Sequence, residues 1–109
     1  MSDLTITNFV VTTATTADLY TRAESLDGGN TVEVTAEAVT ITQDTALILE
    51  VSNDGQNWAD KDTIGILTTS TLLIAGQVTG LAARFYRLRL RMSGSGTAIV
   101  AATACVSEQ

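Results

Sequence analysis

The sequence predicts an all-β protein, an antiparallel β-sandwich of seven or eight short strands. Residues 84–92, RFYRLRLRM, alternate apolar and basic side chains, and four of the six basic residues of the chain lie there. Because successive side chains of a strand point to opposite faces, this stretch is a half-buried strand. Turn signals rich in Gly, Asn and Asp recur about every ten residues. Threonine and valine are frequent, and branching at Cβ suits a pleated sheet.

Composition indicates one domain with an aliphatic core. The chain has 109 residues, of which 45% are apolar and 5% aromatic. Its formal net charge of −6 argues against nucleic-acid binding, since phosphate affinity depends on many Lys and Arg side chains. No apolar run reaches the ~18 residues of a membrane span, so no membrane partner is expected. Residues 1–5 lack the features of a secretory signal, and we expect synthesis in the cytoplasm.

The first 18 residues are expected to form an extended N-terminal arm, followed by a sandwich domain over residues 19–109. Residues 4–12 begin with strict alternation and predict a strand. Residues 12–18 are a Thr/Ala run that reads as a linker or part of the arm. Residues 19–26 fit neither the helical nor the strand period and predict a short or irregular strand, with a single helical turn as the alternative.

A long strand is predicted over residues 31–42, after the turn DGGN at residues 27–30. Its alternation slips in the second half, so that Val39 and Ile41 are expected to face inward. A β-bulge near Ala38 explains the slip.

A β-hairpin is the clearest local signal of the chain. The strand over residues 46–52 runs into SNDGQN at 52–57, where Asp-Gly suits a tight turn with left-handed residues. The return strand is predicted over residues 63–69, with 59–62 as its ragged start.

The last third of the chain predicts three more strands. A short strand is expected at residues 72–75 and a loop at 76–83, before the strand at 84–92. After the turn SGSG at 93–96, the final strand covers residues 97–106 and is apolar on both faces. One face carries Ala98, Val100, Ala102, Ala104 and Val106, and the other carries Ile99, Ala101 and Cys105. A strand whose outer face meets water does not have this pattern. The final strand therefore lies under a neighbouring layer, or its outer face meets another subunit.

Catalytic chemistry is not predicted, and no cofactor is expected. The chain has no histidine, which excludes His-dependent triads and His-ligated metals. Glu33 and Glu37 share a strand face about 13 Å apart, which is wider than the carboxylate pairs of glycosidases. Cys105 has no identifiable base partner. It is interpreted as a small buried apolar residue, with an intermolecular disulfide as the alternative.

Polar residues around the hairpin allow a second interpretation. Asp54, Asp60 and Asp62 could gather around Ca²⁺, although their spacing is not that of an EF-hand loop. The preferred interpretation is turn chemistry, because Asn and Asp bond their own backbone in turns. Trp58, the single Trp, is expected to plug the core beside the hairpin. Alternatively, an exposed Trp could stack on a sugar ring, with Asn53, Asp54 and Asn57 as further glycan contacts.

The arginine ladder, Arg87, Arg89 and Arg91, spans about 13 Å of one face of its strand. The first interpretation is cross-strand pairing with acidic residues such as Glu50, Glu33 or Glu37. The second is an interface between subunits, in which the ladder meets an acidic patch of the next copy. An anionic glycan or nucleic acid is the third. The interface hypothesis combines the ladder with Ile99, Ala101 and Cys105.

The hairpin EVSNDGQNW, residues 50–58, followed by RFYRLRL and a Gly/Ser turn, resembles small jelly-roll sandwiches. Units of this kind recur in phage and prophage structural proteins and in discoidin-type carbohydrate-binding modules. The resemblance covers about residues 45–106 and implies a jelly-roll-like fold without implying a catalytic residue. The shortness of the chain favours the phage type.

These observations predict a non-enzymatic structural protein that assembles with copies of itself and with other proteins of the same assembly. A virion component, such as a decoration, capsid-associated or tail protein, is the first hypothesis. A carbohydrate-binding module is the second, and a bacterial appendage or filament subunit working at the cell surface is the third. In the first and third cases, residues 1–18 would add a strand to a neighbouring subunit.

Overall fold

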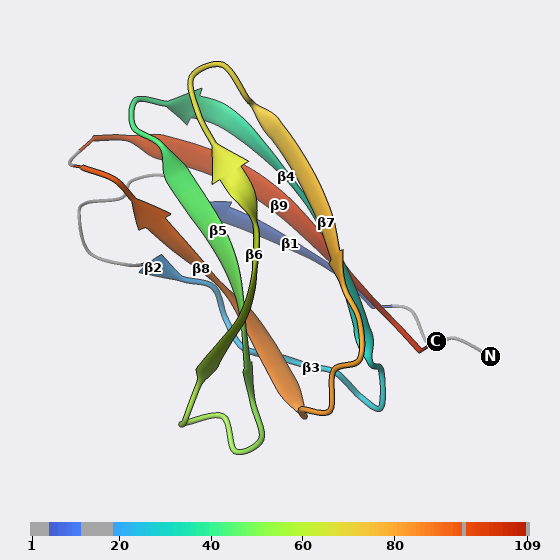
Figure 1. The fold of residues 1–109 in the computed structure, drawn as a ribbon. Coiled ribbons are helices and arrows are strands. Elements are labelled where there is room, and N and C mark those ends of the chain that lie inside the picture. The colour runs from blue at the N-terminus through green and yellow to red at the C-terminus, as the bar shows by residue number, and fades with distance from the viewer. Residues whose placement is uncertain (1–4, 12–18, 95, 109) are drawn as a thin grey trace.

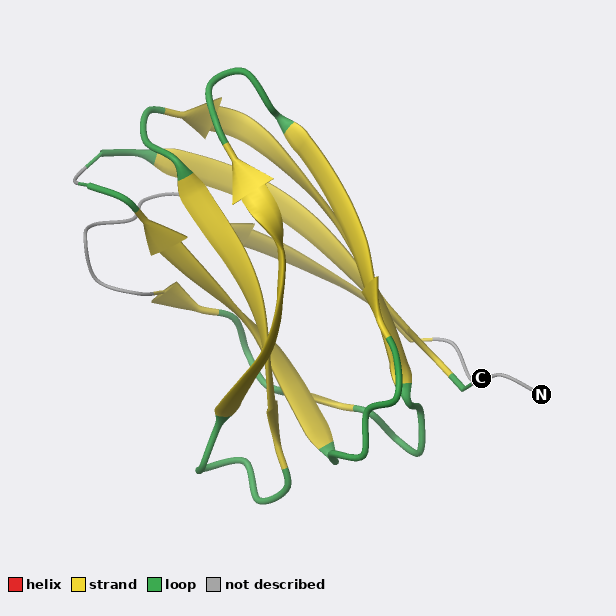
Figure 2. Ribbon diagram, in the orientation of Figure 1, coloured by secondary structure: helices red, strands yellow, loops and turns green. Residues whose placement is uncertain are grey.

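The computed structural model describes residues 5–11, 19–94 and 96–108, and this part of the chain consists of strands, turns and loops (Figures 1 and 2). The strands follow one another as β1 (Thr5–Val11), β2 (Leu19–Tyr20), β3 (Glu24–Ser25), β4 (Thr31–Ile41), β5 (Thr45–Ser52), β6 (Ala59–Leu67), β7 (Leu73–Val78), β8 (Phe85–Met92) and β9 (Ala98–Ser107). All their pairings are antiparallel. The predicted antiparallel β-sandwich is confirmed.

The strands form two facing sheets. One sheet has the order β1-β9-β4-β7, and the other has the order β2-β8-β5-β6, with β3 also paired to β8. Because β2 and β3 lie against the same neighbour, they act as one interrupted strand. The described residues then form eight strands that cross between the sheets in a jelly-roll-like order.

The core lies between the sheets and is mostly aliphatic. From β8, the side chains of Tyr86, Leu88, Leu90 and Met92 are buried, while Arg87, Arg89 and Arg91 point to the other face. The opposite sheet covers them mainly with the small residues of β9 and with Val32, Val34 and Ala36 of β4. Small residues on one sheet therefore face large ones on the other, which fills the space between the layers.

The final strand is not at an edge. β9 lies between β1 and β4, and its inner side chains are the buried set predicted for that face: Ala98, Val100, Ala102, Ala104 and Val106. The opposite sheet thus covers one apolar face of β9. The other face points away from the core, and Ala101 on it is exposed.

The bulge in β4 is confirmed, but its effect on Val39 was predicted wrongly. The register between β4 and β9 shifts between Ala38 and Thr40. Ala38 is buried, whereas the side chain of Val39 is 64% exposed. Because a bulge sets two residues against one, the extra residue leaves the ladder and turns outward.

The strand β6 begins earlier in the chain than predicted, and β7 ends later. β6 begins at Ala59, and β7 continues through Gly76 to Val78 where a loop was expected. A Cβ added at Gly76 would lie 3.1 Å from Cγ2 of Ile64. The glycine therefore marks a close approach of two strands rather than a loop, and β6 and β7 close one side of the sandwich there.

The irregular segment and the turn after it are as predicted. Residues 19–26 form only the two-residue strands β2 and β3. Asp27 and Gly28 adopt φ of 48° and 82°, as the turn signal indicated. Of the predicted arm, residues 5–11 form β1 against β9, and residues 1–4 and 12–18 lie outside the described residues.

Candidate functional site

The outer face of the sheet that contains β8 carries a layered cluster around Arg87. The guanidinium carbon of Arg87 lies 4.1 Å from the ring centre of Tyr20 and 4.3 Å from that of Trp58. Two aromatic rings thus stack on one cation, a favourable arrangement because a ring face is electronegative. The predicted role of Trp58 as a core plug is wrong, since its side chain is half-buried on the outer face and belongs to no part of the described core.

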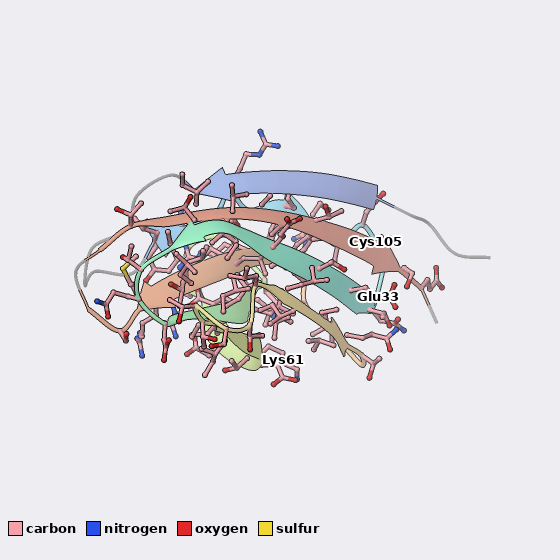
Figure 3. All side chains as sticks on the ribbon, turned by 90° about the horizontal axis from the view of Figure 1, so that it is seen from above. Glu33, Lys61 and Cys105 are labelled. Atoms are coloured by element: carbon pink, nitrogen blue, oxygen red, sulfur yellow. The ribbon has the colours of Figure 1, made fainter. Side chains whose placement is uncertain are left out.

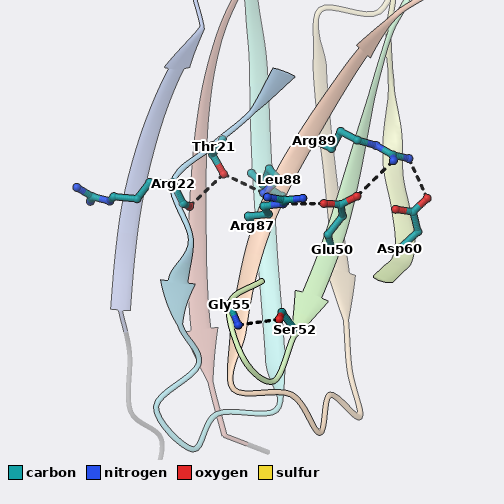
Figure 4. A network of polar contacts seen from close by, with 9 residues as sticks. All are labelled: Thr21, Arg22, Glu50, Ser52, Gly55, Asp60, Arg87, Leu88 and Arg89. Atoms are coloured by element: carbon teal, nitrogen blue, oxygen red, sulfur yellow. Dashed lines mark hydrogen bonds and ion pairs between the residues drawn. The ribbon is translucent and has the colours of Figure 1, made fainter. Parts of the chain in front are cut away.

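Tyr20 reaches this cluster because a polar clamp holds its segment to β8. The backbone N–H of Thr21 donates to the carbonyl of Leu88 at 2.9 Å. In return, the backbone N–H of Leu88 donates to the Thr21 hydroxyl at 2.9 Å (Figure 4). The Thr21 side chain therefore completes the ladder where β2 and β3 are interrupted.

Glu50 is the buried acid of the cluster. Its carboxylate accepts a hydrogen bond from Nε of Arg87 at 2.7 Å and lies 3.3 Å from Nη1 of Arg89. Arg89 also reaches the carboxylate of Asp60 at 2.8 Å (Figure 4). The Glu50 side chain is only 5% exposed, so little water reaches this carboxylate.

For Arg87 and Arg89, the structure shows the first interpretation of the ladder, which was cross-strand pairing with an acidic residue. That residue is Glu50. Glu50 stands opposite Arg87 in the register of β5 with β8. Glu33 and Glu37, the other predicted partners, lie on β4 in the opposite sheet. Two cations and two carboxylates balance here, so this part of the ladder is not a free positive surface.

Arg91 is the exposed member of the ladder. It lies beside a shallow groove of about 280 Å³, which is lined by Asp44, Ala46, Ile66, Arg91 and Ser93. This is at the lower limit of the volumes that ligand sites usually have. The groove therefore gives no clear indication of a small-molecule site.

The hairpin turn is held by its own side chains. The Asp54 carboxylate accepts hydrogen bonds from the backbone N–H groups of Asn57 and Gln56 at 2.8 Å each, and from the Asn57 amide and the Ser52 hydroxyl. These bonds, that of the Asn57 backbone foremost, hold the pKa of Asp54 well below its usual range. The turn chemistry expected for this stretch is therefore present.

The alternative roles of the hairpin residues have little geometric support. Asp54 is bonded within its turn and Asp60 pairs with Arg89, so the predicted calcium cluster with Asp62 does not form. Within residues 19–94 and 96–108, no group of acidic or cysteine side chains is placed to hold a metal ion. Of the proposed glycan contacts, Asn57 is bonded to Asp54, Trp58 lies on Arg87, and Asn53 is exposed.

The interface residues predicted on the final strand share the outward side of β9. Ala101 is exposed, and Ile99 and Cys105 are half-buried there. Figure 3 labels Cys105 near the end of β9. Cys105 is a free cysteine opposite Glu33. Cys105 was predicted to be buried, and the structure shows it only half-buried. The structure brings these residues together on one strand, but places the arginine ladder on the other sheet.

Several exposed apolar side chains gather at one end of the sandwich. Val39 and Leu73 are 64% and 62% exposed, and Leu72 and Ile66 are about half exposed. Val39 and Leu72 come close together because the backbone N–H of Ala38 donates a hydrogen bond to the carbonyl of Leu72 at 2.8 Å, whereas Ile66 lies on β6 in the other sheet. In the part of the chain that the structure describes, no helix has the length and apolar character needed to cross a membrane.

Sequence reasoning missed Tyr20 as a site residue, and it assigned Asp60 to a calcium cluster instead of to the ion pair with Arg89. Tyr20 is distant in sequence from Arg87 and lies in a segment without clear periodicity. Asp60 reaches Arg89 because two register shifts between β5 and β6 set it opposite Glu50. The alternation of β8 predicted a charged outer face, but no local signal predicts which side chains cover it.

Fold and site together define a class, the small antiparallel β-sandwich with a jelly-roll-like strand order and an ion-paired outer face. No protein-family model matches the sequence, and no curated protein matches it. Solved structures do share the fold.

One of these is the Yersinia pseudotuberculosis-derived mitogen, with a TM-score of 0.60 and 11% identity over 96% of this chain and 86% of the other. A second is a structure of Bacillus endospore appendages, described as disulfide-linked pili, with a TM-score of 0.56 and 12% identity over 100% and 92% of the chains. A third is the SPBc2 prophage-derived protein YomS, with a TM-score of 0.58 and 9% identity over 99% and 96%. Of the resemblance stated from the sequence, these structures support the β-sandwich fold and not the discoidin type.

Proposed function

We propose that this chain is a non-enzymatic structural protein that assembles with copies of itself and with other structural proteins. A phage virion component, such as a decoration, capsid-associated or tail protein, is the form we favour. The chain would be made in the cytoplasm and would act in the assembled particle. A bacterial appendage subunit at the cell surface is built on the same principle and differs in the particle formed.

The outward side of β9 is the observation that carries this proposal. An antiparallel sheet that faces water usually alternates apolar residues inside with polar residues outside. β9 instead presents Ile99, Ala101 and Cys105 outward, from the middle of its sheet. Burying such a strip against another molecule would remove apolar area from water, which is favourable.

The fold neighbours support the class of function in a general way. One comes from a prophage and another forms pili, so this sandwich serves in proteins of both origins. Their identities of 9% and 12% relate folds only. For this reason the assembly surface is argued from the residues of this chain.

A carbohydrate-binding module remains the second candidate. Its support is the pair of aromatic rings, Tyr20 and Trp58, on the outer face beside the hairpin, where Tyr20 is 49% exposed. Aromatic rings on a protein surface can stack on the apolar face of a sugar. Arg87 already lies against both rings, which weakens this candidate.

Size-exclusion chromatography with light scattering, followed by negative-stain electron microscopy, tests the proposal. We expect the wild type to form a defined oligomer or regular particle, and Ala101→Lys to reduce it by placing a charge on the outward side of β9. Gln56→Lys, on the exposed hairpin, is the matched control and should assemble as the wild type does. A strictly monomeric wild type that binds a glycan array through Trp58 would instead establish the second candidate.

A further inference from the structure

We propose that the free edge of β1 pairs with β1 of a second copy, in an antiparallel ladder about a two-fold axis. This inference rests on the self-assembly proposed above and adds a second contact, at the edge of the sheet, to the outward side of β9. β1 is the end strand of its sheet, and no described strand lies beyond it (Figure 3). The outer edge of such a strand presents a row of N–H and C=O groups to an incoming strand.

The other edges of the two sheets carry recognisable protection. β6 bears the charged residues Asp60, Lys61 and Asp62 and has two register irregularities against β5. β2 and β3 contain only two residues each. β7 is closed off by β6, where Gly76 packs against Ile64. Charges, bulges, short strands and covering segments are the means by which natural proteins block unwanted strand pairing.

Among the described residues, none of these devices is found at β1. Its seven residues, TITNFVV, contain no charge, no proline and no glycine. Its register with β9 runs through seven consecutive pairs without a shift. A regular, uncharged stretch of this length and high β-propensity pairs readily with another strand. Its position at the end of the sheet is therefore best explained by use as a pairing surface.

Charge and symmetry favour a second copy of the same strand as the occupant. Copies with a net charge of −6 repel each other in general, but residues 4–17 contain no charged side chain. Two copies can therefore approach along this segment with the least repulsion. The chain offers no second long, unprotected edge among its described strands, so a head-to-tail contact has no obvious receiver. An isologous β1–β1 contact needs only the one edge.

Disulfide trapping tests the geometry directly. A two-fold axis perpendicular to the sheet sets one residue of β1 opposite its own counterpart, with Cα atoms about 4.5–5.5 Å apart, which a disulfide spans. We place a single cysteine at each of residues 5–11 in turn, in a Cys105→Ser background. Covalent dimer on mild oxidation should peak sharply at one position. Equal, low yields at all positions would overturn the proposal.

A matched pair of lysine variants separates the edge from the sheet face. Asn8 and Thr35 flank Thr103 in register from opposite sides, Asn8 on β1 and Thr35 on the interior strand β4. We expect Asn8→Lys to weaken self-association by about tenfold or more, because like charges then meet across the new ladder. Thr35→Lys, on the sheet face, should leave the yield of the cysteine-trapped β1–β1 dimer unchanged, and circular dichroism checks that both variants fold.

The outcomes distinguish this inference from the proposed function. If the wild type is monomeric by light scattering, the proposed function and this inference both fail. If the wild type assembles and Asn8→Lys, correctly folded, assembles equally well, the β1 pairing is wrong and the structural role stands. If Thr35→Lys lowers the yield of the trapped β1–β1 dimer as strongly as Asn8→Lys does, the dimer forms through the sheet face and the β1 pairing is wrong.

Discussion

At the scale of single residues, Glu50 has the most demanding environment. Its carboxylate is almost fully buried on the outer face of a sheet, where it pairs with Arg87 and Arg89. Removing one member of a buried ion pair leaves the others desolvated without compensation, which costs more than the pair itself contributes. The stability of this face should therefore depend strongly on Glu50.

We predict that Glu50→Gln lowers the free energy of unfolding by about 3 kcal/mol, since two adjacent guanidinium groups lose their shared carboxylate. Urea denaturation followed by the fluorescence of Trp58 measures this change. Glu24→Gln is the control, because its partner Arg22 is 81% exposed and such pairs contribute about 0.5 kcal/mol or less. Equal losses in the free energy of unfolding would show that the buried Glu50 pair contributes no more to stability than the exposed Glu24 pair.

Asp54 makes the stability of the folded protein depend on pH. Hydrogen bonds from the backbone of Asn57 and Gln56 depress its pKa in the folded state. A depressed carboxyl pKa stabilises the fold above the unfolded pKa of about 3.9, and this contribution is lost as pH falls through the folded value. We predict that wild type loses more stability than Asp54→Asn between about pH 4 and pH 2. Urea midpoints across this range measure it, and parallel curves would contradict the assignment.

At the scale of elements, the closure of the sandwich by β6 and β7 depends on glycine. A Cβ at Gly76 would meet Cγ2 of Ile64 at 3.1 Å and the Ile64 carbonyl oxygen at 3.3 Å. The second contact is with backbone, which cannot rotate away. A substitution here must therefore push the two strands apart.

We predict that Gly76→Ala destabilises the fold by about 1–3 kcal/mol, as overpacking of a close contact does. Gly94→Ala is the control, because the nearest atoms to its Cβ belong to the Gln43 side chain and can move. Its effect should stay within about 0.5 kcal/mol. Thermal unfolding of both variants compares them, and a neutral Gly76→Ala would mean that β6 and β7 pack more loosely than the structure indicates.

At the scale of the whole molecule, the net charge opposes the association that the two proposed contact surfaces would favour. The charge of −6 opposes association between copies, while β1 is uncharged and the outward side of β9 from Ile99 to Ser107 carries no charged side chain. Salt screens repulsion between whole molecules but does not weaken apolar or backbone contacts. Salt dependence therefore reports which kind of surface is used.

We predict that raising NaCl from about 20 mM to about 300 mM increases the assembled fraction, because the Debye length falls well below the size of the protomer. Sedimentation velocity at constant protein concentration measures this. A decrease would indicate contacts between opposite charges, as the predicted interface between the arginine ladder and an acidic patch requires. Arg91→Glu would then be the variant to examine, since Arg91 is the exposed member of that ladder.

Much of the fold followed from local patterns. The alternation in residues 84–92 and 31–38, the Asp-Gly hairpin and the DGGN turn each depend on a few neighbouring residues, and the structure confirms all four. Gly76 was misread as a loop signal because a glycine in a loop and a glycine at a close strand contact look alike in sequence. Val39 was misplaced because the bulge predicts a slip without saying which residue leaves the ladder.

The sequence by itself determined the fold class, most strand positions and the inward set of β8, because these depend on periodicity within single segments. Only the tertiary structure decided that β9 is central, that Glu50 and not Glu33 or Glu37 pairs with the ladder, and that Tyr20 and Trp58 enclose Arg87. These facts depend on which strands become neighbours and in what register. That choice is made by packing between segments far apart in the chain, which no local pattern records.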